Sequence, residues 1–201
     1  WQYDTALKIA RLIRNIFPSA KIALGGYHAT LLYQEISSSV DALYFDYIVR
    51  GEGEIAFKRL VNAMADMDDM TKIDSLSYKE KGKFVHNRVG GLLNLNDIKL
   101  PIRDKRRLTI GYHVFFSKIE VMETSRGCIR TCNFCSMQYM YGRTFRHYNV
   151  ERILKDLDDI YYNRKTRWIF IVDDNMVLDK GHVINLCDAI IERGYKNLKF
   201  I

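Results

Sequence analysis

The feature that most constrains this chain is a set of three cysteines, Cys128, Cys132 and Cys135, at Cys-x3-Cys-x2-Cys spacing. They follow a strand-like run over residues 118–124. Thiolates are soft ligands that suit iron–sulfur clusters, and such clusters usually take four cysteines. Because the local count stops at three, a cubane held here would keep one iron without a protein ligand. The spacing therefore predicts a [4Fe-4S] cluster with one iron open to another molecule.

A structural zinc site is the competing interpretation of these cysteines. Structural zinc takes four closed ligands, usually from two short-spaced pairs of Cys or His. The fourth cysteine, Cys187, lies in an apolar helical pattern, where we expect a packed core thiol. His147 is nearer to the three cysteines, but no second pair accompanies it. The ligand count therefore favours the cluster over zinc.

Cysteine use also bears on the compartment. Four cysteines in 201 residues is ordinary usage for an intracellular protein, and the chain does not open like a signal peptide. No run approaches the ~20 uninterrupted apolar residues that a membrane span needs. We therefore expect a cytoplasmic protein. Residue 1 is Trp and the chain ends within a strand-like run, so we expect both ends to be cuts through a longer protein.

The composition allows one large core or two small ones, because 48% of the 201 residues are hydrophobic. The formal net charge is +7, and residues 103–107 form a dense basic segment. A basic surface can attract nucleic acid, anionic membranes or phosphate groups. Basic residues are spread along the whole chain, however, and we find no nucleic-acid-binding motif. We therefore expect residues 103–107 to be a solvated face of a linker.

The first ~65 residues alternate helix and strand, which favours a parallel α/β sheet. Helical spacing covers residues 4–17 and 29–37, and apolar runs at 21–26 and 46–50 predict strands. Another helix follows residue 54. Its expected inward side chains are Ile55, Phe57, Leu60, Val61 and Ala65.

We place a domain boundary in segment 90–112, which begins with Gly90-Gly91 and is rich in polar and basic residues. The pattern before it, over residues 74–88, predicts a hairpin with a glycine turn. The expected divisions are thus 1–70, a hairpin and linker at 71–112, and a second domain at 113–201.

The second domain continues the alternation of helix and strand. We expect a helix from Asn149, acting as its cap, to residue 162, and another helix over 180–193. Between them, residues 168–172 form a near-continuous apolar run. Such a run predicts a strand covered on both faces.

Two strand ends in the first domain carry unusual residues. One strand ends in Gly25-Gly26-Tyr-His28-Ala-Thr30, and the next ends in Gly51-Glu52-Gly53-Glu54. Ligands of open parallel sheets bind at the carboxyl ends of strands. Glycines there let the backbone approach a ligand closely, or supply the positive φ of a tight turn. Taken singly, each loop is also consistent with an ordinary turn.

The cysteine spacing, with Phe134 before the third cysteine, closely resembles the signature of the radical S-adenosylmethionine (SAM) enzymes. The resemblance implies that the three cysteines bind a [4Fe-4S] cluster, and that the open iron chelates the methionine end of SAM. It also implies that the reduced cluster cleaves SAM to a 5′-deoxyadenosyl radical. Phe134 then packs near the adenine, or is a plain core aromatic.

The two glycine loops, upstream of the cysteines, resemble the cobalamin-binding domain that precedes the radical SAM domain in one large subfamily. The resemblance spans nearly the whole chain. It implies a flavodoxin-like α/β domain followed by the first βα units of a partial (β/α) barrel. It also implies that residues 25–30 and 51–54 hold the lower face and nucleotide tail of cobalamin. For His28 we favour a hydrogen bond to backbone in its turn over ligation of cobalt.

Other positions gain roles from the same resemblance. Asp173 and Asp174 end the second barrel strand, where the family often places polar groups against the SAM ammonium; the alternative is capping of the segment that follows. Arg126 is expected to steady the cluster's charge or to pair with a carboxylate.

The function that the resemblance implies is radical methyl transfer, cyclisation or rearrangement of a small-molecule substrate. An electron donor such as flavodoxin or ferredoxin is the expected partner. A methylthiotransferase acting on RNA is an alternative, although such enzymes carry further N-terminal cysteines and none precedes Cys128. A non-catalytic metal-binding module is the third possibility.

Overall fold

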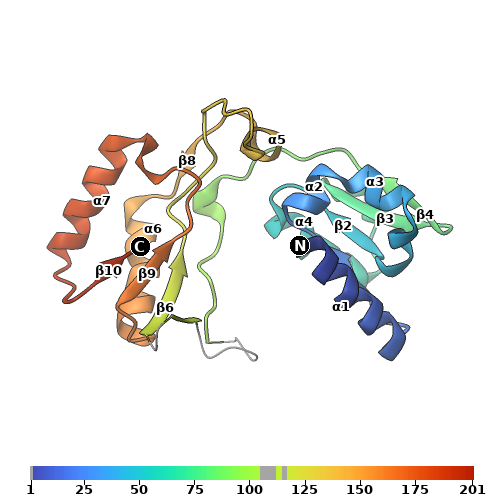
Figure 1. Cartoon of the computed structure of the whole chain (residues 1–201), viewed down its shortest axis with the longest axis horizontal. Coiled ribbons are helices and arrows are strands. Elements are labelled where there is room, and N and C mark those ends of the chain that lie inside the picture. The colour runs from blue at the N-terminus through green and yellow to red at the C-terminus, as the bar shows by residue number, and fades with distance from the viewer. Residues whose placement is uncertain (1, 105–111, 115–116) are drawn as a thin grey trace. The chain divides into compact units, whose positions relative to one another are not determined.

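The computed structural model describes residues 2–104, 112–114 and 117–201. The chain divides into two compact units, Trp1–Leu93 and Asn94–Ile201 (Figure 1). The division lies within residues 90–112, the segment in which the composition placed a boundary. No helix in the described ranges is long and apolar enough to cross a membrane.

The first unit is built on a four-stranded sheet in the order β1-β2-β3-β4. Its strands are β1 (Ala23–Leu24), β2 (Tyr47–Val49), β3 (Leu76–Glu80) and β4 (Lys83–His86). β1 and β2 are parallel, whereas β3 pairs antiparallel with both β2 and β4. The hairpin expected outside the first domain therefore extends its sheet. Burial explains this, because Leu76 and Ser77 are fully enclosed beside β2.

One helix precedes β1, and the others lie between β1 and β2 or between β2 and β3. They are α1 (Gln2–Ile16), α2 (Tyr27–Leu31), α3 (Tyr33–Ser38) and α4 (Gly53–Asp66), with 3-10 turns at Val40–Tyr44 and Met70–Lys72. The single helix expected over residues 29–37 is thus two short helices. They join at Leu32, whose φ of −117° and ψ of 28° depart from helical values.

The inward face of α4 differs from the predicted one. Ala56, Leu60 and Ala63 are its buried residues, whereas the larger Ile55 and Phe57 are 42% and 52% exposed. Val61 and Ala65 are exposed as well. Small side chains on the inward face let the helix backbone lie close to the sheet. The prediction was therefore right for Leu60 alone.

The second unit has a four-stranded sheet in the order β10-β9-β6-β5. The strands are β5 (Tyr112–Val114), β6 (Ser117–Met122), β9 (Trp168–Ile171) and β10 (Lys199–Phe200). β6, β9 and β10 are parallel, and β5 pairs antiparallel with β6. The chain passes from β6 to β9 through α6 (Val150–Asp158) and from β9 to β10 through α7 (Lys180–Glu192). The prediction of an α/β chain with successive βα units is confirmed.

The core of the second unit lies between this sheet and its helices. Fully enclosed side chains come from α6, from the π-helical turn Asp159–Asn163 that continues it, from β9 and from α7: Leu157, Ile160, Ile169 and Leu186. Asn149 occupies the cap position of α6, but its side chain makes no capping hydrogen bond. Its backbone N–H instead donates to Asn96 Oδ1 at 2.8 Å.

Two further expectations fail in this unit for a related reason. Phe170 in β9 and Val172 after it are 45% and 44% exposed, so the strand is not covered on both faces in the described part of the chain. Cys187 is exposed, not packed, because α7 buries Leu186 as its inward residue. In both elements, the apolar pattern of the sequence predicted more burial of these side chains than the structure has.

Arg103 corrects the view of residues 103–107 as a solvated face. It is 8% exposed, and its guanidinium forms two hydrogen bonds with Asp156, at 2.5 and 3.1 Å. Glu120 on β6 and Asp159 lie 3.6 and 3.5 Å from the same group. Buried carboxylates need such a cation, so Arg103 is part of the core. Residues 105–107 lie outside the described residues.

Candidate functional site

The two glycine loops of the first unit meet at the side chain of Thr30. Its hydroxyl donates to the carbonyl oxygen of Gly26 at 2.8 Å and accepts the N–H of Gly51 at 2.9 Å. The loops follow β1 and β2, whose parallel pairing puts their carboxyl ends at one edge of the sheet. The structure thus brings together the two loops that the sequence singled out.

Glycine is needed in these loops for conformation. Gly26 has a φ of +90° and Gly51 a φ of +66°, in the region that side-chain-bearing residues rarely adopt. A Cβ added at either position would meet nothing within 4 Å. Gly25 and Gly53 instead lie close to Val49, whose nearest atoms would be 3.6 and 3.3 Å from an added Cβ. Open space therefore lies beside Gly26 and Gly51, the two positions whose backbone conformation favours glycine.

The ring of His28 stacks on the ring of Tyr3, with centroids 4.3 Å apart and planes at 22°. The backbone carbonyl of His28 accepts the N–H of Leu32 at 2.9 Å. The His28 ring therefore makes an aromatic stacking contact with Tyr3.

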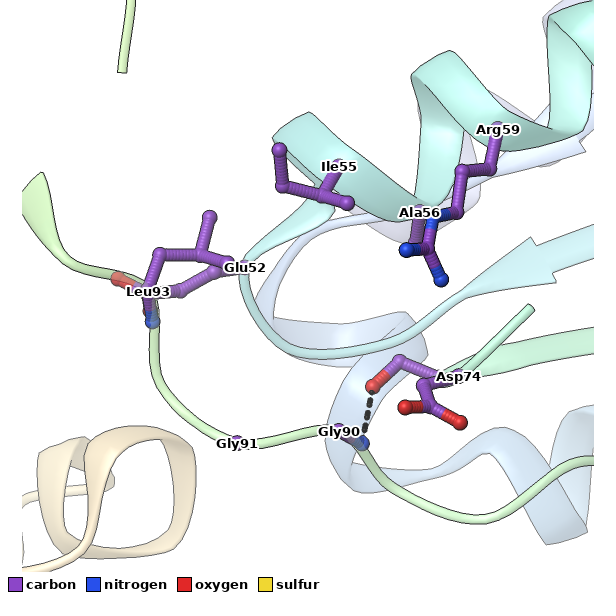
Figure 2. A pocket seen from close by; sticks show the side chains of 9 residues that line it. Glu52, Ile55, Ala56, Arg59, Asp74, Gly90, Gly91 and Leu93 are labelled. Carbon is purple, nitrogen blue, oxygen red and sulfur yellow. Dashed lines mark hydrogen bonds between the residues drawn. The ribbon is translucent and has the colours of Figure 1, made fainter. Parts of the chain in front are cut away.

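Glu52 holds the segment that leads out of the first unit. Its Oε2 accepts the N–H of Leu93 at 2.7 Å, and Gly90 N–H donates to Ser75 Oγ at 2.9 Å. Figure 2 shows the cavity of about 180 Å³ that these residues line, with Arg59 and Asp74 on its wall. Glu54 lies exposed in the first turn of α4. The two glutamates of one motif therefore have different surroundings.

The three cysteines of the second unit lie on one loop. The chain leaves β6, forms β7 (Ser125–Arg126), which pairs with β8 (Arg146–His147), and reaches α5 (Met137–Tyr141) after the last cysteine. All three thiols are free; Cys132 is exposed, and Cys128 and Cys135 are half-buried. Cys135 N–H donates to the carbonyl of Cys132 at 3.1 Å, which closes the turn between them.

The end of β9 holds the beginning of this loop. Asp173 accepts the Thr124 N–H at 2.7 Å, the Thr124 hydroxyl, and the Ser125 hydroxyl at 2.6 Å. Asp174 Oδ2 accepts the Gly127 N–H at 2.7 Å, and burial raises the pKa of this carboxyl. Neither aspartate caps the following segment. The cap of α7 is instead Asp179, which accepts the N–H of His182.

Gly127, directly before the first cysteine, has no room for a side chain. Its φ is +86°, and an added Cβ would collide with the carbonyl oxygen of Thr144. The cysteine loop passes close to the backbone of Thr144 at this point, so both crowding and backbone conformation require glycine here.

Arg126 pairs with a carboxylate, one of its two expected roles. Its Nε lies 2.9 Å from both oxygens of Glu123, and the Tyr148 hydroxyl donates to Glu123 Oε2 at 2.9 Å. Burial raises the pKa of Glu123, and the neighbouring guanidinium opposes that rise. The three side chains stiffen the turn between β6 and the cysteines.

The donor set of the loop fits an iron–sulfur cluster. No three His, Cys, Asp or Glu side chains in the described ranges converge on one metal ion. A cubane does not need that arrangement, because each thiolate binds a different iron. The loop offers three free thiols, and two N–H donors lie at Cys128 Sγ: Arg130 N at 3.5 Å and Asn175 Nδ2 at 3.6 Å. Phe134 is 89% exposed, which excludes a core role for it.

The sequence analysis assigned no role to two sets of residues. Thr124 and Asn175 join the loop to the end of β9, and Asp156 completes the Arg103 cluster. The run of polar residues at the end of an apolar strand was a signal for Asn175. No local signal pairs Arg103 with Asp156, which lies 53 positions away.

Comparison with known proteins places these loops in context. The family model of the B12 binding domain matches residues 1–61. The chain is 32% identical over 193 residues to an uncharacterized methyltransferase of Pyrococcus horikoshii, covering 96% of this chain and 41% of that protein. It is 27% identical to the hopanoid C-3 methylase of Methylococcus capsulatus, covering 97% of this chain and 36% of the methylase.

A similar fold occurs in the cobalamin-dependent S-adenosylmethionine radical enzyme OxsB, solved with aqua-cobalamin and S-adenosylmethionine bound. The TM-score is 0.75 at 24% identity, and the match covers 99% of this chain and 28% of that one. The chain spans about two fifths of the length of the curated relatives it matches.

Proposed function

Because the chain belongs to the radical SAM enzymes that carry an N-terminal cobalamin-binding domain, we propose that it binds two cofactors. Cobalamin occupies the loops joined by Thr30, and a [4Fe-4S] cluster binds to Cys128, Cys132 and Cys135. The observation that supports this best is the coexistence of a B12-binding match over residues 1–61 with three free thiols on one loop. When bound, the cluster and SAM supply a 5′-deoxyadenosyl radical, and cobalamin supplies a methyl carrier.

The protein's own residues bind and orient these groups. Gly26 and Gly51, both at positive φ, keep backbone beside an open space where a macrocycle or its tail can approach. Gly25, Gly53, His28 and Glu54 belong to the same proposed cobalamin loops. The carboxylate of Glu52 accepts the N–H of Leu93, so its part is to hold a connecting segment beside them.

In the second unit, the exposed ring of Phe134 offers a stacking face for the adenine of SAM. Asp173 is fully engaged with Thr124 and Ser125, which favours Asp174 as the acceptor for the SAM ammonium. Among the described residues, Asp174 accepts one hydrogen bond, from the Gly127 N–H to its Oδ2. Its second oxygen is the proposed ammonium acceptor.

The proposed reaction is methyl transfer to an unactivated carbon of a small molecule. The names of the two curated relatives above favour it, since one is a methyltransferase and the other a methylase. A flavodoxin or ferredoxin is the proposed electron donor. Radical cyclisation or rearrangement is the second candidate, because the same radical can serve either outcome.

Anaerobic reconstitution with iron and sulfide tests the cluster. The wild-type protein should gain the broad visible absorbance of a thiolate-bound iron cluster and release 5′-deoxyadenosine from SAM with a strong reductant. C132A should lose both, and the matched control C187A should keep both, because Cys187 is exposed on α7 away from the loop. Loss in C187A together with retention in C132A would contradict the assignment.

A further inference from the structure

The side chain of Asn175 lies against the first cysteine of the loop. Its Nδ2 donates a hydrogen bond to Cys128 Sγ over 3.6 Å. The backbone N–H of Arg130 donates to the same sulfur over 3.5 Å. Among the described residues, no hydrogen bond reaches the sulfur of Cys132 or Cys135. Within the described part of the chain, the sulfur of Cys128 is therefore the one that accepts a hydrogen bond from a side chain.

The position of Asn175 is set by the sheet. β9 pairs in parallel with β6, and the last pair is Met122 with Ile171. The N–H of Val172, one residue after that pair, donates to the carbonyl of Met122 at 3.0 Å. Asp173 and Asp174 then hold Thr124, Ser125 and Gly127. The amide that follows is thereby aimed at the next residue of the loop, which is Cys128.

The residue type matters at this position. Asn175 presents an uncharged N–H donor directly after two carboxylates. A third carboxylate would place a negative charge beside a thiolate, whereas an amide brings a partial positive charge. Hydrogen bonds to the sulfurs of an iron–sulfur cluster are among the factors that set its reduction potential.

We propose that Asn175 is a positioning residue that orients the Cys128 thiolate and raises the reduction potential of the cluster. This inference rests on the proposed function, because it requires that Cys128 bind iron. The donor stabilises the reduced cluster more than the oxidised one, since reduction adds negative charge that the sulfur shares. Removing the donor therefore makes the cluster harder to reduce.

The test compares N175L with N185L in the reconstituted protein. Leu keeps the branching of Asn at Cγ but donates no hydrogen bond, and Asn185 lies exposed on α7 as a matched control. Iron and sulfide analysis gives cluster content, and spectroelectrochemical titration gives the midpoint potential. N175L should keep its cluster and shift to a more negative potential, and N185L should match the wild type. N175D, which preserves shape, should shift in the same direction because it loses the donor and adds charge.

Each outcome decides the proposal. An unchanged or less negative potential in fully loaded N175L or N175D would overturn it. Failure of both variants to load a cluster would also overturn it, because Asn175 would then serve assembly and not the potential. Absence of a cluster in the wild-type protein would instead contradict the proposed function itself, and that result is distinguished by the absorbance of the unmodified protein.

Discussion

At the scale of single residues, the hydroxyl of Thr30 joins the two glycine loops by donating to Gly26 and accepting from Gly51. T30V keeps the shape of the side chain and removes both hydrogen bonds. We expect a loss of about 1–2 kcal/mol in the free energy of unfolding, since one of the two hydrogen bonds is exposed and the other is partly buried. Cobalamin affinity should fall as well.

Urea denaturation and equilibrium dialysis measure the two effects of T30V. T30S is the control, because it keeps a hydroxyl that can form both hydrogen bonds. Equal stability of T30V and the wild type would mean that the loops are held by other contacts.

His182 provides a prediction on pH. Its ring stacks on that of His147 with centroids 3.8 Å apart, and its Nε2 is buried without a hydrogen-bond partner among the described residues. Burial lowers the pKa of His182, and His147 lowers it further, whereas Asp179 and Asp173 oppose the shift. The unfolded chain therefore binds a proton at a higher pH than the folded one does.

The sign of this difference means that stability falls as the pH drops below the ordinary histidine pKa of about 6.5. We expect H182Q to lose less stability than the wild type between pH 7.5 and 5.5 (roughly one unit on either side of that pKa). Urea midpoints at the two pH values measure the difference. Parallel pH dependence in both proteins would show that His182 does not contribute.

At the scale of elements, Arg103 joins the connecting segment to β6 and α6. Its guanidinium lies against Asp156 and Glu120, which are both buried. R103M would leave these carboxylates without their cation. We expect R103M to lower the free energy of unfolding by about 3–5 kcal/mol, the usual effect of removing one partner of a buried ion pair.

The matched control for Arg103 is R193M in the same unit. Arg193 pairs with Asp158 at 3.0 Å, but its side chain is 40% exposed. Exposed ion pairs contribute about 0–1 kcal/mol, so R193M should stay close to the wild type in chemical denaturation. Equal losses in the two variants would show that the buried cluster contributes no more than a surface pair.

At the scale of the whole molecule, the two proposed cofactors are held by separate cores. The cobalamin loops belong to the unit ending at Leu93, and the cysteines belong to the unit that starts at Asn94. G26V forces a branched side chain to a φ of +90°, which costs ~1 kcal/mol or more and fills open space beside the loop. We expect G26V to weaken cobalamin binding and to leave cluster content unchanged.

C128A is the reciprocal variant, expected to lose the cluster and keep cobalamin affinity. Equilibrium dialysis with hydroxocobalamin and iron analysis measure both properties, with circular dichroism as the folding control. Loss of both cofactors in either variant, with the fold intact, would show that the units do not bind them independently.

The sequence by itself determined the features that depend on neighbouring residues. The alternation of helix and strand, the glycine loops after β1 and β2, and the cysteine loop after β6 were all readable from local pattern. They were readable because backbone conformation and strand or helix periodicity extend over a few residues only. The resemblance of the cysteine and glycine motifs then indicated the family.

Only the tertiary structure decided which surfaces are covered and which distant groups meet. α4 turns Ala56 and Ala63 inward in place of Ile55 and Phe57, and Cys187 is exposed, because cover depends on what packs against a helix. Arg103 meets Asp156 across 53 positions, and Asn175 meets Cys128 across 47. Such contacts arise from sheet register and packing between distant segments, which local spacing does not encode.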